Sequence, residues 1–319
     1  MQRLFNPVDN VHNFNPDIDI GPLTGKVIVV TGGNSGCGKE TVLRLAKHSP
    51  GRIYLAARSK AKYDDAMATI TVAAPNASDV VKFLELDLAS LASVKKASET
   101  VLQENDRLDV LVNNAGIMAV PHGLTKDGFE VQFGTNHMGH ALLTRQLLPL
   151  LQKTTKEPSA DVRIINLSSI GHTMAPGEGI QFDKIKTPMK ELHTLRLYGS
   201  SKLANVLYTR ELARRYPDIL CVSIHPGRVE TNLGRTLKQD AGLLYMFSQV
   251  MDCLVKPLSV EAGALNQIWA ATWKRSDIVN GAYYVPAGKE NQGSKLSHDA
   301  NLRERLWTWT EEQLKDLGY

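Results

Sequence analysis

The sequence is poor in cysteine, with Cys37, Cys221 and Cys253 the only three in 319 residues. They form no Cys-x2-Cys pair, which argues against a disulfide framework and against a structural zinc site. No run of about eighteen apolar residues occurs, so no transmembrane helix is expected. The first 26 residues have no apolar core preceded by positive charge, so we expect no secretory signal. Together these absences predict a cytoplasmic protein in a reducing compartment.

A strong excess of one charge is also missing. The 37 basic and 33 acidic residues give a formal net charge of +4, and no long basic run is present. Nucleic acid is therefore not expected as the main partner, and a moderately anionic small molecule fits better. The hydrophobic content of 43% and charged content of 22% are ordinary for a globular enzyme.

What the sequence does contain is a regular alternation of short apolar runs and segments with helical spacing. Strands are predicted at 26–31, 52–57, 81–88, 108–116, 162–169, 220–227 and 281–285. Helices are predicted at 39–49, 60–73, 90–104, 127–152, around Tyr198 and near 259–272. This pattern predicts an α/β fold, a Rossmann-type doubly wound parallel sheet of about seven strands with helices on both faces. We expect a single domain over 25–319, preceded by an irregular N-terminal arm over 1–24.

Two segments interrupt the alternation. Residues 171–196 contain two prolines and three glycines, and loops of this length in a compact domain usually serve a site. In 233–258 the apolar residues follow helical spacing. We expect both to border the substrate, the second as a lid over an apolar molecule rather than as a membrane contact, because few basic residues flank it.

A glycine-rich turn joins the first predicted strand to the first helix, with the spacing Gly32-x3-Gly36-x-Gly38. There, backbone amides and the positive end of a helix dipole can receive a pyrophosphate, although the glycines alone could simply form a turn. At the end of the second strand Ala57 occupies the position where an acidic residue would bind the ribose of NAD, and Arg58 follows. An arginine there favours the 2′-phosphate of NADP, the alternative being the solvated start of a helix.

Tyr198 and Lys202 stand four residues apart in a predicted helix. Residues at i and i+4 share a helix face, so the phenol and the ammonium could point at a common place. The alternative is a helix terminus with a solvated lysine. The remaining motifs favour the first interpretation.

Taken together, the motifs make the chain resemble the short-chain dehydrogenase/reductase family from about Lys26 to about Val285. Within the family it resembles the retinol-dehydrogenase-like and protochlorophyllide-reductase-like branch and many fungal NADP-dependent reductases. The motifs occur in the family's order: Thr31-Gly32-x3-Gly36-x-Gly38, Asn113-Asn114-Ala115-Gly116, Asn136, Ser168-Ser169, Tyr198-x3-Lys202 and Pro226-Gly227.

The resemblance implies four catalytic residues. Tyr198 would be the general acid/base, and Lys202 would lower its pKa and bind the nicotinamide ribose. Ser169 would hydrogen-bond the substrate oxygen, with Ser168 pointing to the other face of its strand. Asn136 would hold a water that links the lysine to solvent.

The resemblance also implies the cofactor contacts. Asp87 could instead be a helix cap, and Cys37 replaces the usual isoleucine or leucine, which would make oxidation possible. The full set of expected NADP(H) contacts is Gly32, Asn34, Ser35, Gly36, Cys37, Gly38, Arg58, Asp87, Leu88, Asn114, Ala115, Gly116, Tyr198, Lys202, Pro226, Gly227, Val229 and Thr231.

Three histidines invite other interpretations. His137 and His140 share a helix at i, i+3, but no third ligand has metal spacing, so we expect no metal. His172 could face the substrate, although a loop histidine is usually solvated.

We therefore expect NADPH-dependent reduction of a ketone or aldehyde on a lipophilic small molecule, reversible as alcohol oxidation. Two alternatives stay open: reduction of a C=C bond on the same scaffold, and a catalytically silent NADP-binding regulator, against which the four filled catalytic positions count. Because the family often pairs subunits through its long helices, the resemblance also leaves a homo-oligomer open.

Overall fold

The computed structural model describes residues 10–229 and 257–319. Its central sheet has eight strands in the order β3-β2-β1-β4-β5-β6-β7-β8. The first seven are parallel and β8 is antiparallel to β7. The strands are β1 (Val27–Thr31), β2 (Arg52–Ala57), β3 (Val81–Glu85), β4 (Val110–Asn113), β5 (Arg163–Leu167), β6 (Leu220–Ile224), β7 (Tyr283–Val285) and β8 (Lys289–Asn291). The Rossmann-type doubly wound sheet is confirmed, and β8 is an additional strand that the sequence pattern did not predict.

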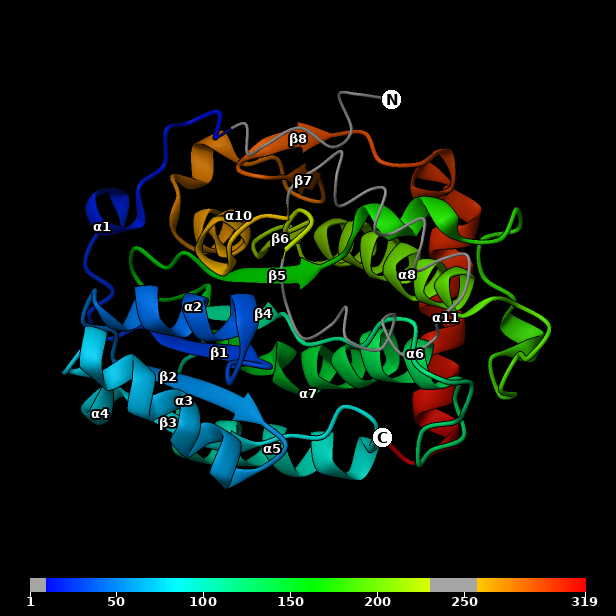
Figure 1. Cartoon of the computed structure of the whole chain (residues 1–319), viewed down its shortest axis with the longest axis horizontal. Coiled ribbons are helices and arrows are strands. Elements are labelled where there is room, and N and C mark those ends of the chain that lie inside the picture. The colour runs from blue at the N-terminus through cyan, green and yellow to red at the C-terminus, as the bar shows by residue number, and fades with distance from the viewer. Residues whose placement is uncertain (1–9, 230–256) are drawn as a thin grey trace.

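Helices cover both faces of the sheet (Figure 1). One face carries α5 (Leu91–Glu104), α7 (Gly139–Thr154), α8 (Thr194–Arg215) and α11 (Ala300–Asp316), and the other carries α2 (Gly36–Ala46), α3 (Lys60–Ala73) and α10 (Val260–Thr272). Short elements are α1 (Pro16–Asp19), α4 (Ala77–Val80), η3 (Ile170–Met174), η4 (Phe182–Lys184), η6 (Arg275–Asp277) and η7 (Lys295–His298). Side chains alternate along each strand, so β1 to β6 supply residues to both cores.

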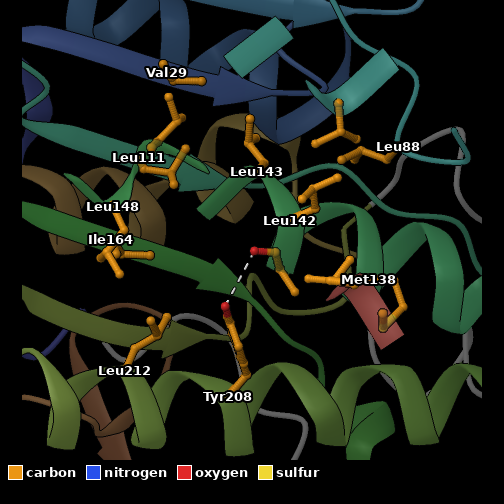
Figure 2. Packing of buried hydrophobic residues seen from close by; sticks show 14 of the residues in the cluster. Val29, Leu88, Leu111, Met138, Leu142, Leu143, Leu148, Ile164, Tyr208 and Leu212 are labelled. Atoms are coloured by element: carbon orange, nitrogen blue, oxygen red, sulfur yellow. Dashed lines mark hydrogen bonds between the residues drawn. The ribbon is translucent and has the colours of Figure 1, made fainter. Parts of the chain in front are cut away.

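Figure 2 shows the core between the sheet and the first set of helices. Val29 and Leu111 from the sheet meet Leu142 and Leu143 of α7, and all four are fully buried. Each such side chain contributes about 1.5–3 kcal/mol relative to exposure. This packing fixes α7 and α8 on the sheet and so positions the strand ends, where the predicted site lies.

The helix predicted at 127–152 begins later and is not regular. It starts as α6 (Val131–Phe133), passes through a π-helical turn, η2 (Gly134–Met138), and continues as α7. Glu130 sets the start, because its carboxylate accepts hydrogen bonds from the backbone amides of Gln132 and Phe133. An acidic N-cap satisfies amides that have no partner within the helix, so the helix begins after it.

The C-terminal helix α11 was not predicted, although its buried residues follow helical spacing: Leu302, Leu306, Thr310 and Leu314. It packs against α8, where the rings of Tyr208 and Trp307 stack with centroids 5.2 Å apart. Among the residues that the structure describes, neither this helix nor any other is long and apolar enough to span a membrane.

The two interrupting segments have different outcomes. Much of 171–196 packs into the core, since Ile180, Phe182 and Ile185 are buried. Its first turn, η3, does lie against Tyr198. Of the predicted lid, all but residues 257 and 258 lie outside the described residues. In the N-terminal arm, the described part contains α1 and buries Phe14 and Leu23.

We expect Leu306→Ala to lower the free energy of unfolding by about 2–5 kcal/mol, because Leu306 is a fully buried residue of α11 and the loss of its side chain leaves a cavity. Urea unfolding followed by circular dichroism measures the change. Leu317→Ala is the matched control, since Leu317 at the end of the same helix is 40% exposed. Equal effects of the two substitutions would contradict the docking of α11.

Candidate active site

The predicted site residues follow the carboxyl ends of neighbouring strands. The glycine turn follows β1, Asn114–Gly116 follow β4, Ser169 follows β5 and Pro226–Gly227 follow β6. Because β1, β4, β5 and β6 are consecutive in the sheet, these segments meet at one edge. Ligands of open parallel sheets bind at this edge.

The turn between β1 and α2 is folded tightly onto the end of β4. Gly32 and Gly36 have φ of +65° and +52°, which glycine adopts without strain. A Cβ on Gly38 would lie 2.5 Å from Nδ2 of Asn114, so no larger residue fits there. Asn114 Nδ2 also donates to the carbonyl of Thr31 at 2.8 Å. The side chain of Asn114 thus packs directly against the glycine turn.

The N-terminus of α2 fits an anionic group. Its N-cap, Ser35, makes no side-chain capping bond, and no acidic residue stands in the first turn. The first amides of a helix and its dipole attract a pyrophosphate where no side chain satisfies them. At the end of β2, Arg58 is exposed and forms no hydrogen bond or ion pair with the described residues, while Ala57 beside it is buried. The residues present therefore fit a phosphorylated dinucleotide.

Two serines at the end of β5 have different partners. Ser168 Oγ donates to the carbonyl of Lys202 at 2.8 Å and so fastens α8 to the sheet. Ser169 Oγ accepts from the amide of Gly171 at 3.0 Å, and its hydroxyl lies close enough to Tyr198 to lower the pKa of that residue. Of the two, Ser169 is therefore the one that meets the predicted acid.

Tyr198 and Lys202 are both buried on α8, at 5% and 4% exposure. The ammonium of Lys202 donates to the carbonyl of Leu167 at 3.0 Å and lies 5.7 Å from the centroid of the Tyr198 ring. The i, i+4 spacing thus brings the two side chains together at the end of β5, as the sequence predicted.

The expected lowering of the Tyr198 pKa is not what the structure gives. Burial raises the pKa of Tyr198 to about 12, and the nearby hydroxyl of Ser169 opposes this only in part. Burial also lowers the pKa of Lys202 to about 8. The physical reason for the raised pKa of Tyr198 is that a buried phenolate would lack hydration. Tyr198 therefore holds its proton at neutral pH, which is the state that an acid needs.

Asn136 lies in the π-helical turn η2, a feature that is common at functional sites. Its side chain is fully buried and pairs with both backbone groups of Ile117, accepting at 2.8 Å and donating at 2.9 Å. Nδ2 also donates to Ser201 Oγ on α8. Asn136 thus joins the loop after β4 to the helix of Tyr198. A Cβ on Gly116 would lie 3.3 Å from Lys202 Nζ, so this loop passes directly beside the lysine.

Comparisons with known proteins agree with this geometry. A family model described as short chain dehydrogenase matches residues 26–181. The short-chain dehydrogenase/reductase drtF of Aspergillus calidoustus is 37% identical, covering 92% of this chain and 95% of its own. The chain belongs to the short-chain dehydrogenase/reductase family. Retinol dehydrogenase 13 of Mus musculus is 38% identical over 90% of this chain and 83% of its own, which supports the retinol-dehydrogenase-like branch.

A solved structure of an uncharacterized protein from Mycobacterium paratuberculosis has the same fold as this short-chain dehydrogenase/reductase. The TM-score is 0.72 at 29% identity, covering 95% of this chain and 97% of the other. Solved structures of the same fold include complexes with NADH and with NADPH. The protein is therefore an oxidoreductase of the carbonyl and alcohol type.

His140 is a residue of this short-chain dehydrogenase/reductase whose place the sequence did not reveal. Its Nδ1 lies 3.0 Å from the carbonyl of Asn136 and its Nε2 lies 2.9 Å from Oγ1 of Thr31. A carbonyl only accepts, so Nδ1 carries the hydrogen and Nε2 accepts from Thr31. Thr31 Oγ1 in turn accepts from the amide of Ala115 at 2.9 Å. The i, i+4 spacing from Asn136 was the available signal.

The histidine pair does not form a metal site within the described chain, where no group of three or more metal-ligating side chains is found. His137 Nε2 pairs with Thr310 Oγ1 of α11 at 3.0 Å. Burial lowers the pKa of His137 to about 3 and that of His140 to about 4. Both rings are therefore neutral and act through hydrogen bonds.

Two expected adenine contacts also have partners within the protein. Leu88 is buried in the core shown in Figure 2 and packs against Gly139. Asp87 Oδ1 accepts from the amide of Ala89 at 3.1 Å, and Lys126 lies 3.5 Å from its other oxygen. The helix cap considered for Asp87 is wrong, because the N-cap of α5 is Ser90 and Asp87 only closes the turn before it.

On the β6 side, Gly227 has φ of +88° and Val229 pairs with Leu258. Val229 and the Cys37 thiol meet at Gly263 of α10, where a Cβ would lie 2.9 Å from Val229 Cγ1 and 3.2 Å from the sulfur. Thr231 lies outside the described residues. The oxidation expected at Cys37 is wrong, because the residue is 8% exposed and burial raises its pKa to about 12, so the reactive thiolate is absent at neutral pH.

We expect Lys202→Met to stabilise the fold at pH 7, with an advantage that shrinks as the pH rises. The unfolded lysine keeps its proton up to about pH 10, whereas the folded protein releases it near pH 8. Between these values the unfolded state binds more protons, so the wild type gains on the variant by up to about 1.4 kcal/mol per pH unit. Leu167 keeps a partner in the variant, because Asn205 Nδ2 also donates to it.

Urea unfolding at pH 7 and pH 9.5 measures this difference. Lys62→Met at an exposed position is the control, and its effect should not change with pH. Parallel stability profiles for wild type and Lys202→Met would show that the lysine is not desolvated.

Proposed function

We propose that this protein uses NADPH to reduce a ketone or aldehyde on a lipophilic small molecule, and that it catalyses the reverse oxidation of the alcohol. One observation carries the proposal: a buried tyrosine with a raised pKa lies close to Ser169 and beside the buried ammonium of Lys202 at the end of β5. This arrangement suits the delivery of a proton to an oxygen that is gaining negative charge.

In reduction, Ser169 and Tyr198 would share the substrate oxygen between their hydroxyl groups. Tyr198 Oη donates its proton to the developing alkoxide, and Ser169 Oγ donates a hydrogen bond to the same oxygen. Lys202 would stabilise the phenolate that remains, because its ammonium is held close to the ring by Leu167. A bound nicotinamide supplies the hydride, for which side chains have no equivalent.

The choice of NADPH rests on two positions. Ala57 offers no carboxylate that would bind the ribose hydroxyls of NAD and repel a 2′-phosphate. Arg58 is exposed at the same strand end and can pair with that phosphate. The amides at the start of α2 would hold the pyrophosphate.

The lipophilic substrate is supported by the apolar surface next to Tyr198. Met174 is 39% exposed, although it ends the turn that packs on the tyrosine ring. A Cβ on Gly171 would touch both side chains, at 2.8 Å from Tyr198 Cε1 and 3.3 Å from Met174 Cε. The mouse relative is named for retinol, a largely apolar alcohol.

We expect Tyr198→Phe to lower kcat by about 100-fold or more with NADPH binding retained, because the proton donor is lost. NADPH oxidation at 340 nm against a panel of lipophilic ketones, aldehydes and enones measures turnover, and fluorescence titration measures binding. Tyr208→Phe is the control on the same helix, since its hydroxyl makes a long hydrogen bond of 3.5 Å to the carbonyl of Ala141.

Undiminished turnover in Tyr198→Phe would contradict the proposed acid. Turnover with enones alone would replace carbonyl reduction by C=C reduction. Tight NADPH binding with no turnover on the panel would favour a role in cofactor sensing.

We expect Arg58→Ala to raise the KM for NADPH by about tenfold and to leave the KM for NADH unchanged, since only NADPH loses a charge-assisted hydrogen bond. Steady-state kinetics with both cofactors measure this. Lys60→Ala, which removes a neighbouring charge that pairs with Asp64, is the control. An equal rise in the KM for NADPH and for NADH would show that Arg58 does not bind the 2′-phosphate.

A further inference from the structure

His172 is buried at 1% exposure, three residues after Ser169, in the turn η3. The expectation that this loop histidine is solvated is wrong. Its Nδ1 lies 2.7 Å from the carbonyl of Ser169, and its Nε2 lies 2.9 Å from the backbone amide of Ser294. The imidazole therefore links the predicted catalytic serine to the segment between β8 and η7.

These two partners determine where the imidazole proton lies. The carbonyl of Ser169 can only accept, so Nδ1 carries the hydrogen. The amide of Ser294 can only donate, so Nε2 is unprotonated. Burial and the charge of Arg210 lower the pKa of His172, in agreement with a neutral ring. A charged ring would place Nε2–H against the amide hydrogen of Ser294.

The segment that holds His172 is itself tightly ordered. Gly293 has φ of +71°, and a Cβ there would lie 2.8 Å from Ser297 Oγ and 3.2 Å from His172 Nε2. Ser297 Oγ donates to the carbonyl of Ser294 at 2.6 Å, and Ser294 Oγ accepts from the amide of Ser297. The Tyr283 ring meets the imidazole edge-on, with centroids 5.0 Å apart. His172 thus has one orientation, set from three sides.

The bond to Ser169 bears on the position of its hydroxyl. Ser169 Oγ is held by the amide of Gly171, which lies two residues along the chain. If the peptide group that directly follows Ser169 rotated, the amide of Gly171 in the next peptide group would shift and the Ser169 hydroxyl would lose its place at Tyr198. The imidazole opposes this rotation because it holds the carbonyl of Ser169, which belongs to the rotating peptide group.

We propose that His172 is a positioning residue that keeps Ser169 Oγ directed at Tyr198, and that the backbone amide of Ser294 keeps His172 in its working orientation. The inference rests on the proposed function and assigns a role in it to a C-terminal segment. That segment lies beyond residues 26–181, which the family model matches.

Two substitutions at His172 test the first half of the proposal. His172→Phe keeps a ring without hydrogen bonds and should lower kcat by about tenfold to a hundredfold, the cost of a small misplacement of a catalytic group. The KM for NADPH should stay within about twofold of the wild type, because the glycine turn is not involved. His172→Asn keeps a donor near the position of Nδ1 and should recover most of kcat.

Two substitutions at Ser294 test the second half. Ser294→Pro removes the amide hydrogen at a residue whose φ of −88° is close to that of proline, and kcat should fall. Ser294→Ala removes the hydroxyl that accepts from the amide of Ser297 and keeps the amide that meets His172, so kcat should fall much less than in Ser294→Pro. The ¹⁵N spectrum of the imidazole in the whole protein gives a readout besides activity, and should show hydrogen on Nδ1 at pH 7 in the wild type and in Ser294→Ala.

Wild-type kcat in His172→Phe, a parallel rise in the KM for NADPH, or hydrogen on Nε2 would each overturn the inference and leave the proposed function standing. Equal losses in Ser294→Pro and Ser294→Ala would overturn the role of the amide. A wild type without turnover on the carbonyl panel would instead overturn the proposed function, and the inference with it.

Discussion

The carbonyl of Leu167, at the end of β5, is the point on which the candidate site depends. It accepts hydrogen bonds from Lys202 Nζ and from Asn205 Nδ2, both at 3.0 Å, and Ser168 next to it donates to the backbone of α8. A buried ammonium is costly unless it is paired, and this carbonyl is its hydrogen-bond partner. The bond from Lys202 to Leu167 therefore holds α8 against the sheet and fixes the position of Tyr198, which lies one helical turn before Lys202. The lowered pKa of Lys202 is the cost of this seating.

A second set of hydrogen bonds connects the end of β1 with the segment after β4 and with α7. Thr31 ends β1, and its hydroxyl links the amide of Ala115 after β4 to the ring of His140 in α7. The other ring nitrogen of His140 donates to the carbonyl of Asn136, and the side chain of Asn136 accepts from the backbone amide of Ile117. The glycine turn and the π-helical turn that carries Asn136 are thus connected by bonds with fixed donors and acceptors. A fully satisfied buried network of this kind permits one arrangement.

Local patterns predicted much of this from the sequence. Seven short apolar runs predicted the seven parallel strands, because strands buried by helices on both faces of a sheet are rich in apolar residues. The spacing of Tyr198 and Lys202 predicted their meeting, since a helix repeats every 3.6 residues. The glycine spacing predicted the turn before α2, where a side chain at Gly38 would collide with Asn114.

The failures of prediction involve tertiary contacts. Strand β8 is polar and pairs through its backbone with β7, so it carries no apolar pattern. Leu88 and His172 turn inward because of Gly139 and Ser294, partners 51 and 122 positions away in the sequence (139 − 88 and 294 − 172). The pKa of Tyr198 depends on burial, which the motif does not encode. Sequence spacing thus indicates which side chains share a face, but not what surrounds them.

The charge at the site is confined to few groups. His137, His140 and His225 have pKa values lowered by burial to about 3, 4 and 3, so none of them is charged near neutral pH. His172 is shifted in the same direction. Tyr198 is protonated there, which leaves Lys202 as the group whose charge changes nearest to neutrality. A site built on neutral imidazoles can hold its geometry over a wide pH range while one ammonium sets the electrostatic environment of the tyrosine. Because that ammonium favours the phenolate left after proton donation, the same lysine that seats α8 would also make Tyr198 an effective acid.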